Sequence, residues 1–202
     1  MRSQLPALFH ADTAHEVRAL VSSGVPVDLR AKDTGHTPLH LSLSISAVNE
    51  LIRLGADVST RSFCGQDTPL HKQQTNALIV ASLIRAHADV NALDNEGNTP
   101  LHMAFTPAVV FRLLKAGANP SIRNSKEELP EDHYGDYLSS RAMTRMVKEV
   151  RRHGRLLRGS WKDYYVGKIA TNPRKNSRAN QSIQPTPGER SPSNLHQPPG
   201  VG

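Results

Sequence analysis

The 202-residue sequence has little cysteine, few aromatic residues and no long apolar run. Its single cysteine, Cys64, excludes an intramolecular disulfide and any zinc site built from several cysteines. It also favours a reducing, intracellular location in the cytoplasm or the nucleus. The longest apolar run is residues 77–81, whereas a membrane-spanning helix needs about 20 residues. The first ten residues hold no apolar segment of the kind found in secretory signal peptides, so none is expected.

The sequence also lacks the short motifs that mark common catalytic and cofactor sites. It contains no Gly-x-Ser-x-Gly nucleophile motif, phosphate-binding loop, dinucleotide fingerprint or His-Glu-x-x-His zinc motif. Its scattered histidines have no Cys or His partners at metal-ligand spacing. We therefore expect no enzymatic activity, no cofactor and no bound metal, and we expect Cys64 to be an exposed bystander thiol.

Positive charge is concentrated near the C-terminus. The formal net charge is +7, but residues 139–178 alone hold 12 Lys and Arg against Glu149 and Asp163, a net charge of +10. The rest of the chain therefore carries a net charge of −3. From about Thr171 onward, Pro, Ser, Asn, Gln and Gly dominate, which predicts a disordered tail.

What the sequence does contain is an internal repeat. A tetrapeptide recurs at intervals of 31 residues: Thr37, Pro38, Leu39 and His40; Thr68, Pro69, Leu70 and His71; Thr99, Pro100, Leu101 and His102. A Gly-Ala-Asp-like segment follows each copy, at residues 55–58, 87–90 and 117–120, with a degenerate earlier copy at 24–28. An apolar pair precedes each of these segments, at 20–21, 51–52, 83–84 and 113–114. Repetition at this period indicates a solenoid of stacked units.

Each unit is predicted to be a helical hairpin followed by an extended loop. Threonine before proline favours a helix start, because its hydroxyl can cap free N–H groups and proline fits the first turn. The apolar pair predicts a second helix, and Gly24, Gly55 and Gly117 stand where a left-handed residue can end it. One such unit cannot bury its own apolar face, so the units must stack.

The pattern resembles the ankyrin repeat, whose signature is Thr-Pro-Leu-His-x-Ala in a period of about 33 residues. The resemblance implies an all-α solenoid of about five units over residues 3–153. Its first unit would have helices near 5–10 and 14–22, and its last would begin near Leu129 and end in a helix around 141–153. A basic, aromatic extension at 154–170 and the disordered tail at 171–202 would follow.

The match to the ankyrin pattern is imperfect at three points. Each helical hairpin is about two or three residues shorter than the family pattern at its inner turn. His87 replaces a helix-ending glycine, and histidine adopts positive φ only at a cost. The alanine that packs the two helices is Ser42 and Gln73 in the first two full units. For Gln73 this leaves two alternatives, loose packing or exposure to a partner.

The resemblance implies that the chain binds another protein, as a monomeric, non-enzymatic adaptor or inhibitor. The partner would dock in the concave groove formed by loop tips and inner helices. Phe63 and Leu93 are the candidate apolar anchors, whereas His40, His71 and His102 are implied to hydrogen-bond between units. The candidate contact residues are Arg30, Lys32, Asp33, His36, Arg61, Phe63, Gln66, Lys72, Gln73, Leu93, Asn95, Glu96 and Phe105.

Alternatives remain for the C-terminal third. Segment 139–178 could bind nucleic acid or an anionic surface, and the apolar face of Arg141–Arg158 could meet a membrane or calmodulin. It could equally be the last helix of the stack. Trp161, Tyr164 and Tyr165 could stack on nucleic-acid bases or cover the open end of the solenoid, which we favour. The protein could also be an effector that is delivered into a host cell.

Overall fold

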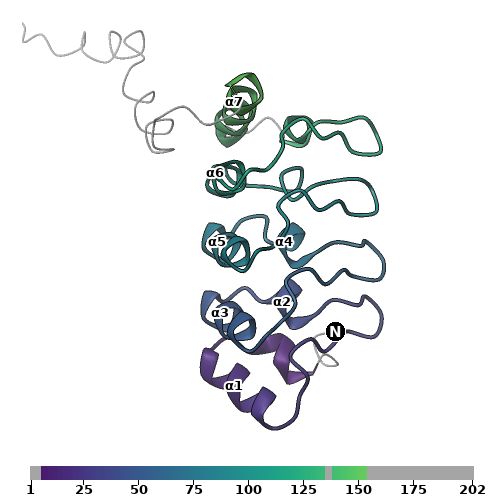
Figure 1. Cartoon of the computed structure of the whole chain (residues 1–202), viewed down its shortest axis with the longest axis vertical. Helices are drawn as coiled ribbons and strands as arrows, with labels where there is room; N and C mark the ends of the chain where they lie inside the picture. The colour runs from purple at the N-terminus through teal and green to yellow at the C-terminus, as the bar shows by residue number, and fades with distance from the viewer. Residues whose placement is uncertain (1–5, 135–137, 154–202) are drawn as a thin grey trace, which may run out of the picture.

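The computed structural model describes residues 6–134 and 138–153. These residues form an elongated stack, with short helices on one side and a row of extended loops on the other (Figure 1). Within the described ranges every regular element is helical and no strand occurs. The predicted all-α solenoid of helical hairpins with extended loops is therefore confirmed.

The outer layer contains one helix per repeat. These helices are α1 (Ala14–Ser22), α3 (Ile45–Arg53), α5 (Ala77–Arg85), α6 (Pro107–Lys115) and α7 (Leu138–His153). The first four each begin after a side chain that accepts a backbone N–H of the first turn, namely Thr13, Ser44, Asn76 and Thr106. Successive outer helices pack on one another and bury a continuous apolar core that includes Val17, Leu51, Leu83, Leu113 and Val147.

The inner layer is much reduced. Its elements are four residues long: η1 (Ala7–His10), α2 (Pro38–Leu41), α4 (Pro69–Lys72) and η2 (Pro130–His133). In the third full repeat, residues 100–103 form only turns. The shortened hairpins explain this, since an α-helical turn takes about 3.6 residues and the chain must then reverse. Each inner segment up to the third full repeat still buries one leucine: Leu8, Leu39, Leu70 and Leu101.

The Thr-Pro-Leu-His motifs tie each repeat to the next. In all three, the histidine Nδ1 accepts the threonine N–H, at 3.1, 3.2 and 3.0 Å along the chain. The histidine Nε2 reaches the carbonyl of Asp67, Asn98 or Glu128 in the following repeat. The inter-repeat role of these histidines is confirmed. At Thr37 and Thr68 the threonine and the histidine form a capping box, in which the threonine hydroxyl lies 2.9 Å from Nδ1 and the ring accepts the threonine N–H.

The three motif histidines are buried and uncharged. Desolvation lowers the pKa of all three imidazoles, to about 4 for His40. Because Nδ1 accepts a main-chain N–H, the single ring proton resides on Nε2, which donates it to the next repeat. A neutral imidazole therefore acts as acceptor within its own repeat and as donor to its neighbour.

Left-handed residues end the outer helices at the four predicted positions. Gly24, Gly55 and Gly117 have φ of 98°, 91° and 94°, and His87 has φ of 64°. The cost that histidine incurs at such a φ is therefore present in this structure.

Replacing His87 with glycine is expected to raise the melting temperature. Glycine adopts this φ without steric strain, whereas a residue with a Cβ incurs a cost of about 1–2 kcal/mol there. The exposed imidazole of His87 contributes little packing that the substitution would remove. Thermal unfolding followed by circular dichroism measures the change. Gly55→His is the matched control and is expected to lower the melting temperature, since a Cβ there meets no atom within 4 Å and only strain is added. A lower melting temperature for His87→Gly would contradict the assignment of this position.

The described part of the basic segment is the outer helix of the last repeat. Helix α7 buries Met143, Met146, Val147 and Val150 and packs on α6. For residues 141–153 this confirms the interpretation as the last helix of the stack, and these four apolar side chains are not free for a membrane or calmodulin contact. No helix of the described ranges is long and apolar enough to cross a membrane. Trp161, Tyr164, Tyr165 and the segments 154–170 and 171–202 lie outside the described residues.

Candidate partner-binding surface

The tips of neighbouring loops are joined by backbone hydrogen bonds. The N–H of Phe63 donates to the carbonyl of Thr34 at 2.8 Å, and the N–H of Asn95 donates to the carbonyl of Gly65 at 2.9 Å. In the next pair of loops, the N–H of Ser125 donates to the carbonyl of Glu96 at 2.8 Å. The tip residues are therefore carried on a braced backbone, which suits a binding surface.

Two arginines brace the same connection with their side chains. The guanidinium of Arg30 donates to the carbonyl of Arg61 at 2.9 Å. The guanidinium of Arg61 donates in turn to the carbonyls of Gln66 at 3.0 Å and Leu93 at 2.6 Å. Arg30 and Arg61, predicted as contact residues, are thus engaged in holding neighbouring loops together. Their 31-residue spacing was the sequence signal for this role.

Phe63 is an exposed aromatic side chain held in place by the preceding loop. It is 53% exposed. Its ring lies so close to Gly35 that a Cβ there would come within 2.5 Å of ring atoms, and the Arg30 guanidinium carbon lies 5.4 Å from the ring centroid. An ordered aromatic side chain loses little conformational entropy on binding, which suits an anchor.

A second row of outward side chains lies at the inner turns of the hairpins. Leu43, Gln74 and Phe105 occupy equivalent positions at 31-residue intervals, and Leu43 is 79% and Phe105 65% exposed. The N–H of Phe105 donates to the carbonyl of Gln74 at 2.8 Å, so these turns are also linked. Leu43 was missed by the sequence analysis, although its spacing from Phe105 could have identified it.

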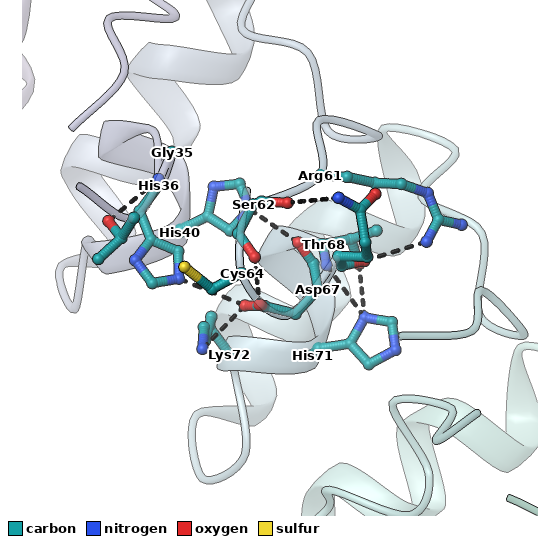
Figure 2. A network of polar contacts seen from close by, with 12 residues as sticks. Gly35, His36, His40, Arg61, Ser62, Cys64, Asp67, Thr68, His71 and Lys72 are labelled. Carbon is teal, nitrogen blue, oxygen red and sulfur yellow. Dashed lines mark hydrogen bonds and ion pairs between the residues drawn. The ribbon is translucent and has the colours of Figure 1, made fainter. Parts of the chain in front are cut away.

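A buried carboxylate, Asp67, organises the polar residues beside the loops (Figure 2). The Ser62 hydroxyl donates to it, the Lys72 Nζ lies 2.8 Å from Oδ2, and the His36 Nε2 lies 3.4 Å from Oδ2. Burial raises the pKa of Asp67, but hydrogen bonds from Lys72 and Ser62 outweigh that effect, and the pKa falls to about 2. Asp67 therefore stays ionised and holds the predicted contact residues Lys72 and His36.

Gln73 requires a correction. It is only 3% exposed, and its side-chain amide donates to the carbonyl of Ser42 in the preceding repeat at 3.3 Å. Neither predicted alternative holds, because the side chain is a packed contact between repeats.

We use the term loop-and-turn surface for the exposed loop-tip and inner-turn residues that remain: Lys32, Asp33, Leu43, Phe63, Gln66, Leu93, Asn95, Glu96 and Phe105.

In residues 6–134 and 138–153, cysteine and the other metal-ligating side chains add no metal site. Cys64 is exposed at a loop tip, with its Sγ 3.8 Å from the carbonyl of Asp33. In the part of the chain that the structure describes, no group of three or more His, Cys, Asp or Glu side chains is placed to hold a metal ion.

Known proteins match the repeated segment. Residues 96–125 match the family model described as Ankyrin repeat. The chain is 39% identical over 104 residues to neurogenic locus notch homolog protein 1 of Xenopus tropicalis, covering 48% of this chain and 4% of that protein. It is 31% identical over 149 residues to NF-kappa-B inhibitor delta of Mus musculus, covering 55% of this chain and 46% of that protein. The chain therefore spans less than half the length of these relatives.

Proposed function

We propose that this chain, which is an ankyrin-repeat protein, binds a partner protein through its loop-and-turn surface. In that complex it acts as a non-enzymatic adaptor or inhibitor. Ankyrin repeats are protein-interaction modules. A stack of such repeats offers an extended surface whose specificity depends on the side chains that it displays.

The observation that carries the proposal is the display of apolar side chains on a braced backbone. Phe63 and Leu93 lie on loop tips, and Leu43 and Phe105 lie at inner turns, all of them exposed. Scattered apolar residues are normal on any protein surface. Here, however, Leu43 and Phe105 occupy equivalent positions of two repeats, and hydrogen bonds join the loop tips and the inner turns to their neighbours.

The inhibitor role is supported by one relative, which is named as an inhibitor of NF-kappa-B. An inhibitor of this type needs only to cover a surface of its target, and a rigid stack of repeats can do so without catalytic groups. The single cysteine supports a setting in the reducing interior of a cell.

A triple substitution tests the proposed surface. Phe63→Ala, Leu93→Ala and Phe105→Ala in the full-length chain are expected to weaken binding of an affinity-captured partner at least tenfold, since apolar anchors carry much of the binding energy of an interface. Lys72 is left in place because it pairs with buried Asp67. Titration calorimetry with the purified partner measures the change.

The control variant is His15→Ala, which removes an exposed side chain from the outer helix α1, away from both the loops and the inner turns. It is expected to leave the affinity unchanged, and all variants should keep the melting temperature of the wild type. Partner binding that survives the triple substitution would show that the loop-and-turn surface is not the site.

A second candidate function rests on helix α7. Its exposed Arg141, Arg145, Lys148 and Arg152 follow one another at i, i+4, i+7 and i+11, which places them along one face. Arg151 lies off this stripe, and its guanidinium pairs with Glu131 at 2.5 Å. Such a stripe supports binding of nucleic acid or another polyanion, and this function predicts an affinity that falls steeply with added salt.

A further inference from the structure

A cleft of about 410 Å³ is lined by residues of the outer helices α3, α5 and α6. These helices lie on the opposite side of the stack from the loops (Figure 1). Its apolar part is formed by Ile45 of α3 and by Leu78, Ala81 and Ile84 of α5. Its cationic part is formed by Arg85 at the end of α5 and by Arg112 and Lys115 of α6. We call this feature the outer cleft.

The cations of the outer cleft differ from those nearer the N-terminus of the same layer. Around α1 and α3, Arg18 and Arg53 both pair with the carboxylate of Glu50, at 3.0 and 2.6 Å. Helices α5 and α6 contain no aspartate or glutamate, and no acid lines the cleft. The positive charge of this part of the surface is therefore not balanced by lining carboxylates.

The simplest role for these cations is to stabilise helix C-termini, where positive charge is favourable. Arg85 fits that role, because its guanidinium donates to the Ala81 carbonyl at 3.2 Å and the Ser82 hydroxyl at 3.0 Å. That role does not account for the apolar floor beside them. Leu78 is 60% exposed, and it lies on the same helical face as Ala81 and Arg85.

We propose that the outer cleft binds an acidic amphipathic peptide segment of a partner protein. Apolar side chains of the peptide would cover Leu78 and Ile84, and its carboxylates would face Arg112 and Lys115. The chain's own residues 154–178 are an unsuitable occupant, because they carry seven Lys and Arg against Asp163. A nucleic acid would leave the apolar floor unused. The proposal adds a second site to the loop-and-turn surface and does not depend on it.

The test uses a labelled peptide probe and the full-length protein. The probe is a 14-residue peptide of leucine and glutamate, with leucines spaced to form one face of a helix, and binding is followed by fluorescence anisotropy. We expect saturable binding that weakens at least tenfold in the double variant Arg112→Glu, Lys115→Glu and in Leu78→Gln. Leu78→Gln keeps the test valid if the charge reversals disturb folding, since Leu78 is mostly exposed.

The matched control is the double variant Lys32→Glu, Lys126→Glu, which makes the same charge change at exposed loop residues. It should leave peptide affinity within about twofold of the wild type, and a peptide with lysine in place of glutamate should not bind. The proposal is overturned if the acidic peptide shows no saturable binding, or if the loop variant rather than the cleft variants removes it. A single-stranded DNA that displaces the peptide at equal or lower concentration would also overturn it, by making the site a general anion site.

Discussion

Replacing His71 with alanine is expected to lower the free energy of unfolding by about 3 kcal/mol. The imidazole is 2% exposed and joins two repeats at the middle of the stack. Its removal leaves the N–H of Thr68 and the carbonyl of Asn98 without their buried partner and opens a cavity between repeats. Because each repeat of a solenoid is stabilised by its neighbours, a central break weakens both sides.

Urea unfolding of the full-length protein measures this loss. His15→Ala is the control, because His15 is exposed on α1 and alanine is a strong helix former. That change should alter the free energy of unfolding by less than about 0.5 kcal/mol. A loss below about 1 kcal/mol for His71→Ala would mean that the histidine series does not hold the repeats together.

The second large effect is a loss of stability in mild acid. The pKa of His40 is about 4 in the folded protein, against 6.5 for an unperturbed imidazole, and burial lowers the pKa of His71 and His102 as well. Between these values the unfolded chain binds protons that the folded chain does not, so the free energy of unfolding falls as pH falls. His40 alone is expected to cost about 3 kcal/mol by pH 4.

Carboxylates extend the same trend to lower pH. The folded pKa of Asp67 is about 2, so the stability that its ionised form contributes is present above its ordinary pKa of 3.8 and is lost below it. The window between pH 6.5 and 4.5 therefore reports on the histidines. Urea unfolding at pH 7.5, 6.5, 5.5 and 4.5 should show a decreasing midpoint with an unchanged m-value. A constant midpoint across this range would contradict the buried, neutral state of the three imidazoles.

The repeat architecture was predictable because its signals are local and periodic. The Thr-Pro-Leu-His motif, the apolar pairs and the helix-ending residues recur at fixed spacing, and each depends mainly on its own short segment. Residues Gly24, Gly55, His87 and Gly117 all adopt the expected positive φ. The shortened hairpin was also visible, although the loss of a regular inner helix at residues 100–103 was not.

The surface was less predictable because it depends on which neighbour a side chain meets. Gln73 was a candidate for partner contact on polarity alone. In the structure it is buried, and its side-chain amide donates a hydrogen bond to the carbonyl of Ser42 in the preceding repeat. Arg30 was a candidate on charge, and its guanidinium binds a carbonyl 31 residues further along the chain. The outer cleft combines residues from three helices, and no short sequence pattern encodes such a combination.

The central claim is that a partner protein docks on the loop-and-turn surface, and site-specific photo-crosslinking tests it most directly. Benzoylphenylalanine would be placed at position 63 on a loop tip, at position 105 on an inner turn, and at position 15, an exposed site on outer helix α1. The account predicts crosslinks from positions 63 and 105 to one and the same partner, and none from position 15. Crosslinks from position 15 alone would contradict it and place the interaction on the outer helices.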